Sequence, residues 1–186
     1  MEIPDDLQKA IDFHGHLCPG LAIGYRAARG AMQRLGLKRA YDEELVCVVE
    51  NKSCSVDAVQ YLSGCTFGKG NLIFQDYGKQ VFTFALRRRP ESALRVSLKA
   101  GAIDAPHDGE HPAERRQRVL ETLLSSALEE LFYIEEVDFE MPEEAQIEPS
   151  IPCKNCGEPT MQSRLVSREG CLLCIPCSHG WQPPSR

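Results

Sequence analysis

Apolar residues recur at helical spacing near the start of the chain. Residues 3–13 predict a short helix, with Asp5 and Asp6 in the first turn, where carboxylates complement the positive end of the helix dipole. A second helix is expected to begin at Pro19, which suits the first helical turn, and to end at Gly36. One strip of this helix is small, so another element is expected to pack closely against it; the strip contains Gly20, Gly24, Ala27 and Ala31.

Shorter apolar runs follow and predict strands. Residues 44–50 are almost continuously apolar, which is typical of a buried strand. Residues 54–64 suit a helix. The runs "LIFQD" and "QVFTFALRR" alternate around a turn at Tyr77-Gly78, which predicts a hairpin, and residues 93–98 add another strand.

The strongest helical pattern begins at Pro112. Its apolar stripe predicts one long helix, and the stripe comprises Val119, Leu120, Leu123, Leu124, Ala127, Leu128 and Leu131. The run "EEVDFE" predicts a last strand. Helices interleaved with these strands predict an α+β fold, in which helices pack on a mixed, mostly antiparallel sheet.

A change of composition separates this core from the C-terminus. The segment "EMPEEAQIEPSIP" holds three prolines and four glutamates without periodicity, which is typical of a linker. We therefore expect a core domain at residues 1–140, a linker at 141–152 and a small domain at 153–186.

Charge and hydropathy limit the partners and the cellular location that can be expected for this protein. The 186 residues carry a net charge of -6, which disfavours nucleic acid as the main partner. There is no apolar run of 18 residues, and the N-terminus lacks the basic-then-apolar pattern of a signal peptide, so we expect a cytoplasmic protein without a membrane partner.

Nine cysteines are informative in a reducing compartment, where clustered cysteines indicate metal binding or catalysis before disulfides. "CKNC" and "CIPC" are two Cys-x2-Cys pairs with 17 residues between them, a spacing that suits a structural zinc ion. The expected ligands are Cys153, Cys156, Cys174 and Cys177. Cys171 is an alternative to Cys177, because "CLLC" has the same spacing. This domain is close to neutral once loaded, so its surface suits a protein partner better than nucleic acid.

The stretch "FHGHLCPG" collects a second set of ligand-type side chains. His14, His16 and Cys18 alternate, so in an extended backbone they share one side. Cys18 and Cys54 each lie at a predicted helix start, which favours the thiolate as a nucleophile or a ligand. Imidazole and thiolate groups suit Zn²⁺, Fe²⁺ or Ni²⁺, so a second metal site is a hypothesis beside the alternative of a packed turn.

Two further residues are candidates for chemistry beside these thiols. Asp57 follows Cys54 by three residues, on the same helical face. Lys69 lies in the turn "CTFGKGN" and can serve an anionic ligand. We therefore take Cys18, Cys54, Asp57 and Lys69 as candidate catalytic residues.

Three blocks, "FHGHLCPGLAIGYRAA", "VENKSCSVDAVQYLSGCTFGKGNL" and "DYGKQVFTF", resemble the E-subunit family of formylmethanofuran dehydrogenase. "CKNCGEP…CLLCIPC" is similar to the treble-clef zinc finger that some members append. The resemblance implies a shared α+β core, a homodimer and association with a molybdenum or tungsten formylmethanofuran dehydrogenase in one-carbon metabolism. It places His14, His16, Cys18 and Cys54 on the family's His/Cys motif, and Asp57, Cys65 and Lys69 in its second block.

Two functions follow as hypotheses. The first is a metal- and thiol-containing accessory subunit or small enzyme of this family. The second is a non-catalytic binding or metal-handling module that docks an oxidoreductase through its zinc finger. A nucleic-acid regulator ranks last because of the acidic charge.

Overall fold

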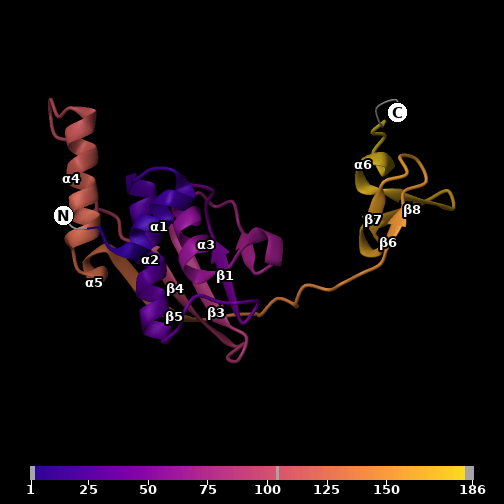
Figure 1. The fold of residues 1–186 in the computed structure, drawn as a ribbon, viewed down its shortest axis with the longest axis horizontal. Coiled ribbons are helices and arrows are strands. Elements are labelled where there is room, and N and C mark those ends of the chain that lie inside the picture. The colour runs from indigo at the N-terminus through magenta and orange to yellow at the C-terminus, as the bar shows by residue number, and fades with distance from the viewer. Residues whose placement is uncertain (1–2, 104, 183–186) are drawn as a thin grey trace. The chain divides into compact units, whose positions relative to one another are not determined.

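The computed structural model describes residues 3–103 and 105–182, and it divides the chain into two units, Met1–Glu144 and Ala145–Arg186 (Figure 1). Each unit has its own secondary structure and its own buried cluster. Within the described residues, no helix is both long and apolar enough to cross a membrane.

The first unit is built on a five-stranded sheet in the order β2-β1-β3-β4-β5. β1 pairs with β2 in parallel, and the remaining neighbours are antiparallel, so the predicted α+β fold with a mixed sheet is confirmed. The strands are β1 (Leu45–Val49), β2 (Leu72–Phe74), β3 (Val81–Leu86), β4 (Ser92–Leu98) and β5 (Phe132–Asp138).

The predicted hairpin around Tyr77-Gly78 is wrong. β2 and β3 do not pair with each other, because β1 lies between them: Cys47 is opposite Leu72 on one side and Phe84 on the other. Every residue of β1 is buried, so its backbone groups need partners on both edges. That requirement places β1 inside the sheet. β2 and β3, the two strands on either side of the turn at Tyr77-Gly78, are separated as a result.

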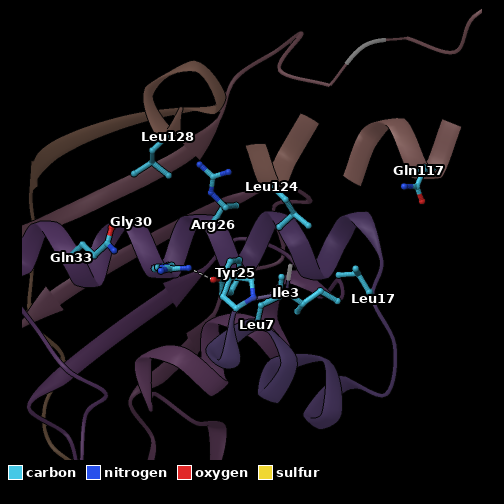
Figure 2. A pocket seen from close by; sticks show the side chains of 12 residues that line it. Ile3, Leu7, Leu17, Tyr25, Arg26, Gly30, Gln33, Gln117, Leu124 and Leu128 are labelled. Atoms are coloured by element: carbon cyan, nitrogen blue, oxygen red, sulfur yellow. Dashed lines mark hydrogen bonds between the residues drawn. The ribbon is translucent and has the colours of Figure 1, made fainter. Parts of the chain in front are cut away.

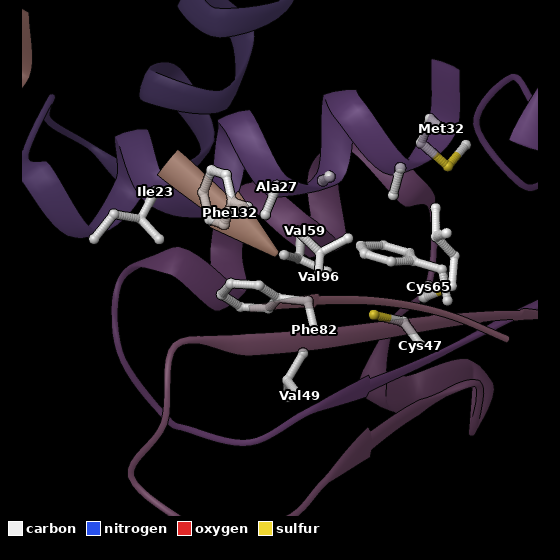
Figure 3. Close-up of a cluster of buried hydrophobic side chains, with 14 of the residues drawn as sticks. Ile23, Ala27, Met32, Cys47, Val49, Val59, Cys65, Phe82, Val96 and Phe132 are labelled. Carbon is white, nitrogen blue, oxygen red and sulfur yellow. The ribbon is translucent and has the colours of Figure 1, made fainter. Parts of the chain in front are cut away.

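Helices α2 and α3 cover one face of this sheet (Figure 1). Figure 3 shows Ala27 of α2 and Val59 of α3 above Phe82 and Val96 of the sheet, all of them fully buried. The helices and the short 3-10 turn of this unit are α1 (Asp5–His14), α2 (Pro19–Leu35), α3 (Ser55–Ser63), η1 (Phe67–Lys69), α4 (Pro112–Ser125) and α5 (Leu128–Leu131).

The helix predicted from Pro112 is shorter than its apolar stripe suggests. α4 ends at Ser125, and Ser126 and Ala127 are extended before α5 begins. The guanidinium of Arg26 donates hydrogen bonds to the carbonyls of Leu123 and Ser126, the latter at 2.6 Å. A half-buried cation therefore satisfies carbonyls at the end of α4, which an uninterrupted helix would have bonded internally.

The small strip of α2 has the close neighbour that its composition predicts. A side-chain carbon added at Gly24 would lie 2.0 Å from the carbonyl oxygen of Ser55, and one added at Gly20 would lie 3.1 Å from Cβ of Cys54. Only glycine therefore allows the start of α3 to rest on α2 at this distance.

The second unit is a small domain of short elements. Two antiparallel pairs, β6-β7 and β8-β9, are followed by one helical turn. The elements are β6 (Ser150–Pro152), β7 (Pro159–Met161), η2 (Gln162–Arg164), β8 (Leu165–Arg168), β9 (Cys171–Cys174) and α6 (Ile175–Ser178).

Residues 141–152, which the sequence predicts to be a linker, make defined contacts at both ends. Arg87 Nη1 donates a hydrogen bond of 2.7 Å to the carbonyl of Pro142, which ties the first residues to the core unit. The last three residues form β6, paired with β7. Arg87 fixes the first end and β7 fixes the second. Both lie outside the segment, so its own composition does not reveal these contacts.

Replacing Gly24 by alanine is expected to lower the free energy of unfolding of the core unit by about 3 kcal/mol or more, because the new methyl group meets backbone that cannot move aside cheaply. Gly68→Ala is the matched control. The space around Gly68 is open within 4 Å, so a change below about 0.5 kcal/mol is expected. Guanidinium unfolding followed by circular dichroism measures both; equal stability of the two variants would contradict the close packing.

Candidate metal sites

The first cluster forms where α1 ends and α2 begins. α1 stops at His14 because Gly15 adopts a left-handed conformation (φ 98°), which turns the chain back toward α2. Cys18 is the N-cap of α2, and its Sγ accepts a hydrogen bond of 3.4 Å from the Leu21 amide. His14 Nε2 lies 3.9 Å from Cys18 Sγ.

α3 brings the third member of the cluster. Cys54 precedes α3, and the approach of Gly20 to Cys54 holds this helix start against the start of α2. One ligand atom each from His14, Cys18 and Cys54 then lie within 4.8 Å of one another. His14 and Cys18 are 4 residues apart in sequence, and Cys54 follows Cys18 by 36 residues. The fold brings these three side chains together.

Asp57 contacts the histidine of this cluster. Its Oδ2 lies 2.6 Å from His14 Nδ1, so the carboxylate accepts the Nδ1 proton and leaves the Nε2 lone pair directed toward the thiols. The His14 side chain is only 11% exposed, against 38% for Asp57. Histidines that bind metals commonly donate their second ring nitrogen to a carboxylate, which fixes the tautomer and the ring orientation.

His16 and Lys69, the other candidates from the sequence, are not part of this group of ligand atoms. The ring of His16 packs on that of His14, with centroids 4.6 Å apart, but its nitrogens lie outside the group of ligand atoms within the described chain. Lys69 Nζ donates to the carbonyls of Tyr41 and Asp42, at 3.3 and 3.2 Å. These contacts of Lys69 stabilise the turn before β1 and do not involve the three clustered ligands.

The two remaining thiols of the first unit are buried in its core. Cys65 Sγ lies 3.3 Å from the carbonyl of Leu45, and burial raises the pKa of Cys65 to about 11. Cys47 is fully buried inside β1, and burial holds its pKa well above the usual range. Both behave as small apolar side chains.

Cys54 differs from the expectation that a helix start would favour its thiolate. Burial, and then hydrogen bonding to the Cys18 thiol, raise the pKa of Cys54. Its side chain makes no capping hydrogen bond to α3, and the hydrogen bond from its own backbone offsets only part of these effects on the pKa. A cation held by Cys18 and Cys54 would favour the thiolate form of both.

The donor set fits a transition metal. Tetrahedral Zn²⁺ with ordinary bond lengths places a nitrogen and a sulfur ligand about 3.6 Å apart. The observed separation of His14 Nε2 and Cys18 Sγ is 3.9 Å. This separation is close to the tetrahedral value, so the donor set is compatible with such an ion.

The second cluster lies in the small domain. Cys153, Cys156, Cys174 and Cys177 are all buried, and their sulfurs lie within 4.8 Å of one another. Cys156 Sγ and Cys174 Sγ are 3.9 Å apart, close to the separation of about 3.8 Å between two thiolates on one tetrahedral Zn²⁺. Cys171 is exposed, at the start of β9, and lies outside the group within the described residues.

Backbone amides donate hydrogen bonds to a thiol of this cluster and lower its pKa. Desolvation opposes a charge on Cys153, yet hydrogen bonds from the amides of Cys156, Cys174 and Asn155 lower its pKa to about 6. The Cys174 amide donates to Cys153 Sγ at 3.2 Å. The backbone amides therefore favour the thiolate form of Cys153, which is the form that binds a metal.

A cleft also opens in the first unit, and the sequence pattern did not indicate it. Its volume is about 590 Å³, and it lies among α1, α2 and the α4–α5 region (Figure 2). Leu7, Leu17, Tyr25 and Leu124 give it an apolar lining, while Arg29, Gln33 and Gln117 supply polar groups. Four elements distant in sequence build it, so no local motif marks it.

The fold and these clusters define a class of protein: an α+β domain with a His/Cys cluster, followed by a four-cysteine zinc finger. The chain belongs to the FmdE family, described as "FmdE, Molybdenum formylmethanofuran dehydrogenase operon", whose family model matches residues 13–138. Residues 147–180 match the prokaryotic dksA/traR C4-type zinc finger. The resemblance seen in the sequence is thereby confirmed, and the C-terminal cluster is a zinc site.

Two proteins show how far this similarity extends. A "Probable S-adenosyl-L-methionine-binding protein" of Archaeoglobus fulgidus is 31% identical over 195 aligned positions, which cover 92% of this chain and 52% of the relative. The chain thus spans about half the length of that curated relative. An FmdE-like protein of the tungsten formylmethanofuran dehydrogenase type, from Syntrophus aciditrophicus, has a similar fold, with a TM-score of 0.69 and 23% identity, covering 94% of this chain and 90% of that one.

Cys177→Ser is expected to reduce zinc in the finger to well below one ion per chain, because a hydroxyl replaces a thiolate in the closed shell. Cys171→Ser is expected to keep the zinc of the unaltered protein, since Cys171 is exposed. Elemental analysis after dialysis against a weak chelator compares the two. The opposite pattern would make Cys171 the ligand.

Proposed function

We propose that this chain is a metal- and thiol-containing accessory subunit that works with a molybdenum or tungsten formylmethanofuran dehydrogenase. Family membership supports the association, because the family description names that dehydrogenase's operon. The His/Cys cluster supports the metal- and thiol-containing part of the proposal.

The hydrogen bond between Asp57 and His14 is the observation that carries the metal assignment. At 2.6 Å it is short, and it orients the half of the imidazole that faces Cys18 and Cys54. A histidine that only packs in a turn has no need of such an orientation. In this proposal His14, Cys18 and Cys54 are ligands, and Asp57 is the residue that positions His14.

One nitrogen and two sulfurs favour Zn²⁺, Fe²⁺ or Ni²⁺ over the harder cations. When bound, such an ion acts as a Lewis acid on whatever occupies its remaining position. His14 and both thiols are partly exposed, so a small ligand can reach that position from solvent.

The zinc finger would supply the docking surface for the dehydrogenase. Its own four-cysteine site holds it together, so its surface does not depend on the core site. The homodimer and the cytoplasmic location expected from the sequence stay predictions, as do the catalytic roles of Lys69 and Cys54.

Replacing Asp57 by asparagine is expected to weaken core metal binding by about 10- to 100-fold, because the ring of His14 exchanges a charged carboxylate acceptor for a weaker, neutral amide oxygen. Asp12→Asn, at an exposed carboxylate of α1 that contacts Gln8, is the matched control and is expected to change nothing. Cobalt titration of protein whose finger already holds zinc gives the affinity from the thiolate-to-metal absorption band. A wild-type protein that takes up no second metal would contradict the proposal.

A second candidate function is binding of S-adenosyl-L-methionine. The relative from Archaeoglobus fulgidus carries that description, and the cleft of about 590 Å³ in this chain is large enough for such a ligand. Tyr25 and Arg29 line this cleft, where the guanidinium of Arg29 pairs with the Asp6 carboxylate at 3.6 Å.

Leu124→Trp is expected to reduce S-adenosyl-L-methionine affinity at least about tenfold, since the larger side chain fills the cleft. Isothermal titration measures the affinity, and Leu172→Trp in the finger is the control at another leucine. Absence of any heat of binding to the unaltered protein would remove this candidate.

A further inference from the structure

The two thiols of the core cluster lie close to each other. The sulfurs of Cys18 and Cys54 are within 4.8 Å. Both residues are half-buried, so a small solute can reach the sulfurs from solvent. Cys47 and Cys65, by contrast, are fully buried.

The backbone keeps the two thiols together whether or not a metal is present. Cys18 is anchored as the N-cap of α2 through the Leu21 amide. Cys54 is held by the close approach of Gly20 to its Cβ. A disulfide needs the sulfurs at about 2.05 Å, so the two side chains have to rotate about their Cα–Cβ bonds to close the remaining separation.

We propose that Cys18 and Cys54 form a reversible disulfide when the core site holds no metal, by exchange with a small-molecule disulfide such as oxidised glutathione. One core thiolate attacks the glutathione disulfide, giving a mixed disulfide and one glutathione thiolate. The second core thiolate attacks the core sulfur of that mixed disulfide and releases the other glutathione. The core pair loses two electrons and two protons, and the glutathione disulfide gains them as two thiols.

The disulfide and the metal exclude each other, since both use the same two sulfurs. This part of the inference rests on the proposed function. A bound ion blocks the sulfurs from the oxidant, while the disulfide leaves His14 as the only remaining ligand of the cluster. The site thereby couples its metal content to the thiol–disulfide balance of its surroundings.

Peptide mapping of the full-length protein tests the disulfide directly. The chain is prepared with zinc in the finger and none in the core, exposed to oxidised glutathione, alkylated and digested with trypsin without reduction. The expected product joins peptide 10–26 to peptide 53–69 with the loss of two hydrogens, and fragment ions assign the bond to Cys54 and not Cys65. A dithiol reductant separates the peptides again.

Single substitutions sharpen the result. Cys54→Ser is expected to stop the crosslink and leave Cys18 as a stable mixed disulfide with glutathione. Cys171→Ser, which removes an exposed thiol outside both clusters, is expected to leave the crosslink unchanged. Separate mixed disulfides on Cys18 and Cys54, or two reduced thiols, in the folded wild-type protein would overturn the disulfide.

Metal addition separates this inference from the proposed function. Loading the core with Zn²⁺ first is expected to slow crosslinking by about tenfold or more. An undiminished rate in protein with demonstrated core metal would overturn the mutual exclusion. If no core metal binds but the crosslink forms, the metal proposal fails and the disulfide stands; if metal binds and no crosslink forms, the reverse holds.

Discussion

The contact between the backbones of Gly24 and Ser55 is the constraint on which the core site depends. It sets how closely α2 and α3 approach, and therefore how close two helix starts come to each other. Cys18 belongs to one start and Cys54 to the other, so their sulfurs meet only at this separation. Larger residues on α2 would leave the fold's layers in place but move the thiols apart.

A second interaction joins α1 to the same point. The hydrogen bond from His14 to Asp57 links the end of α1 to the first turn of α3. Each of the three helices therefore contributes one group at its terminus, and the sheet below supports them through buried contacts such as those of Phe82 and Val59. Termini are where helices leave backbone groups unpaired, which explains why the Leu21 amide is free to bind Cys18 Sγ.

The local chemistry of the sequence predicted much of this arrangement. Pro19 and Gly36 marked the ends of α2, and the small residues marked its packed face. The strand pairing and the break of α4 depend on residues far apart in sequence, so local patterns did not predict them. The sequence alternation around Gly78 favoured a hairpin, but β1 competes for the same edge of β3, and the α4 break depends on Arg26, almost 100 residues away. The alternation of His14, His16 and Cys18 likewise predicted a common side, whereas α1 continues through His14 and only the turn after Gly15 decides which side chains meet.

The two clusters differ in how far the fold depends on a metal. The finger has as its buried cluster four cysteines with little apolar surface around them, so without zinc its core would consist of mutually repelling thiolates or desolvated thiols. The first unit buries Phe82, Phe84 and Phe132 beneath α2 and α3 and packs Tyr25 of α2 against Leu7 of α1, and this hydrophobic core is complete without any ion. His14, Cys18 and Cys54 are only partly buried, and they are fewer than the four ligands of a closed site. A fold that does not need these donors for stability can leave them available to metal, ligand or oxidant, which is why we infer a functional role for the core cluster and a structural one for the finger.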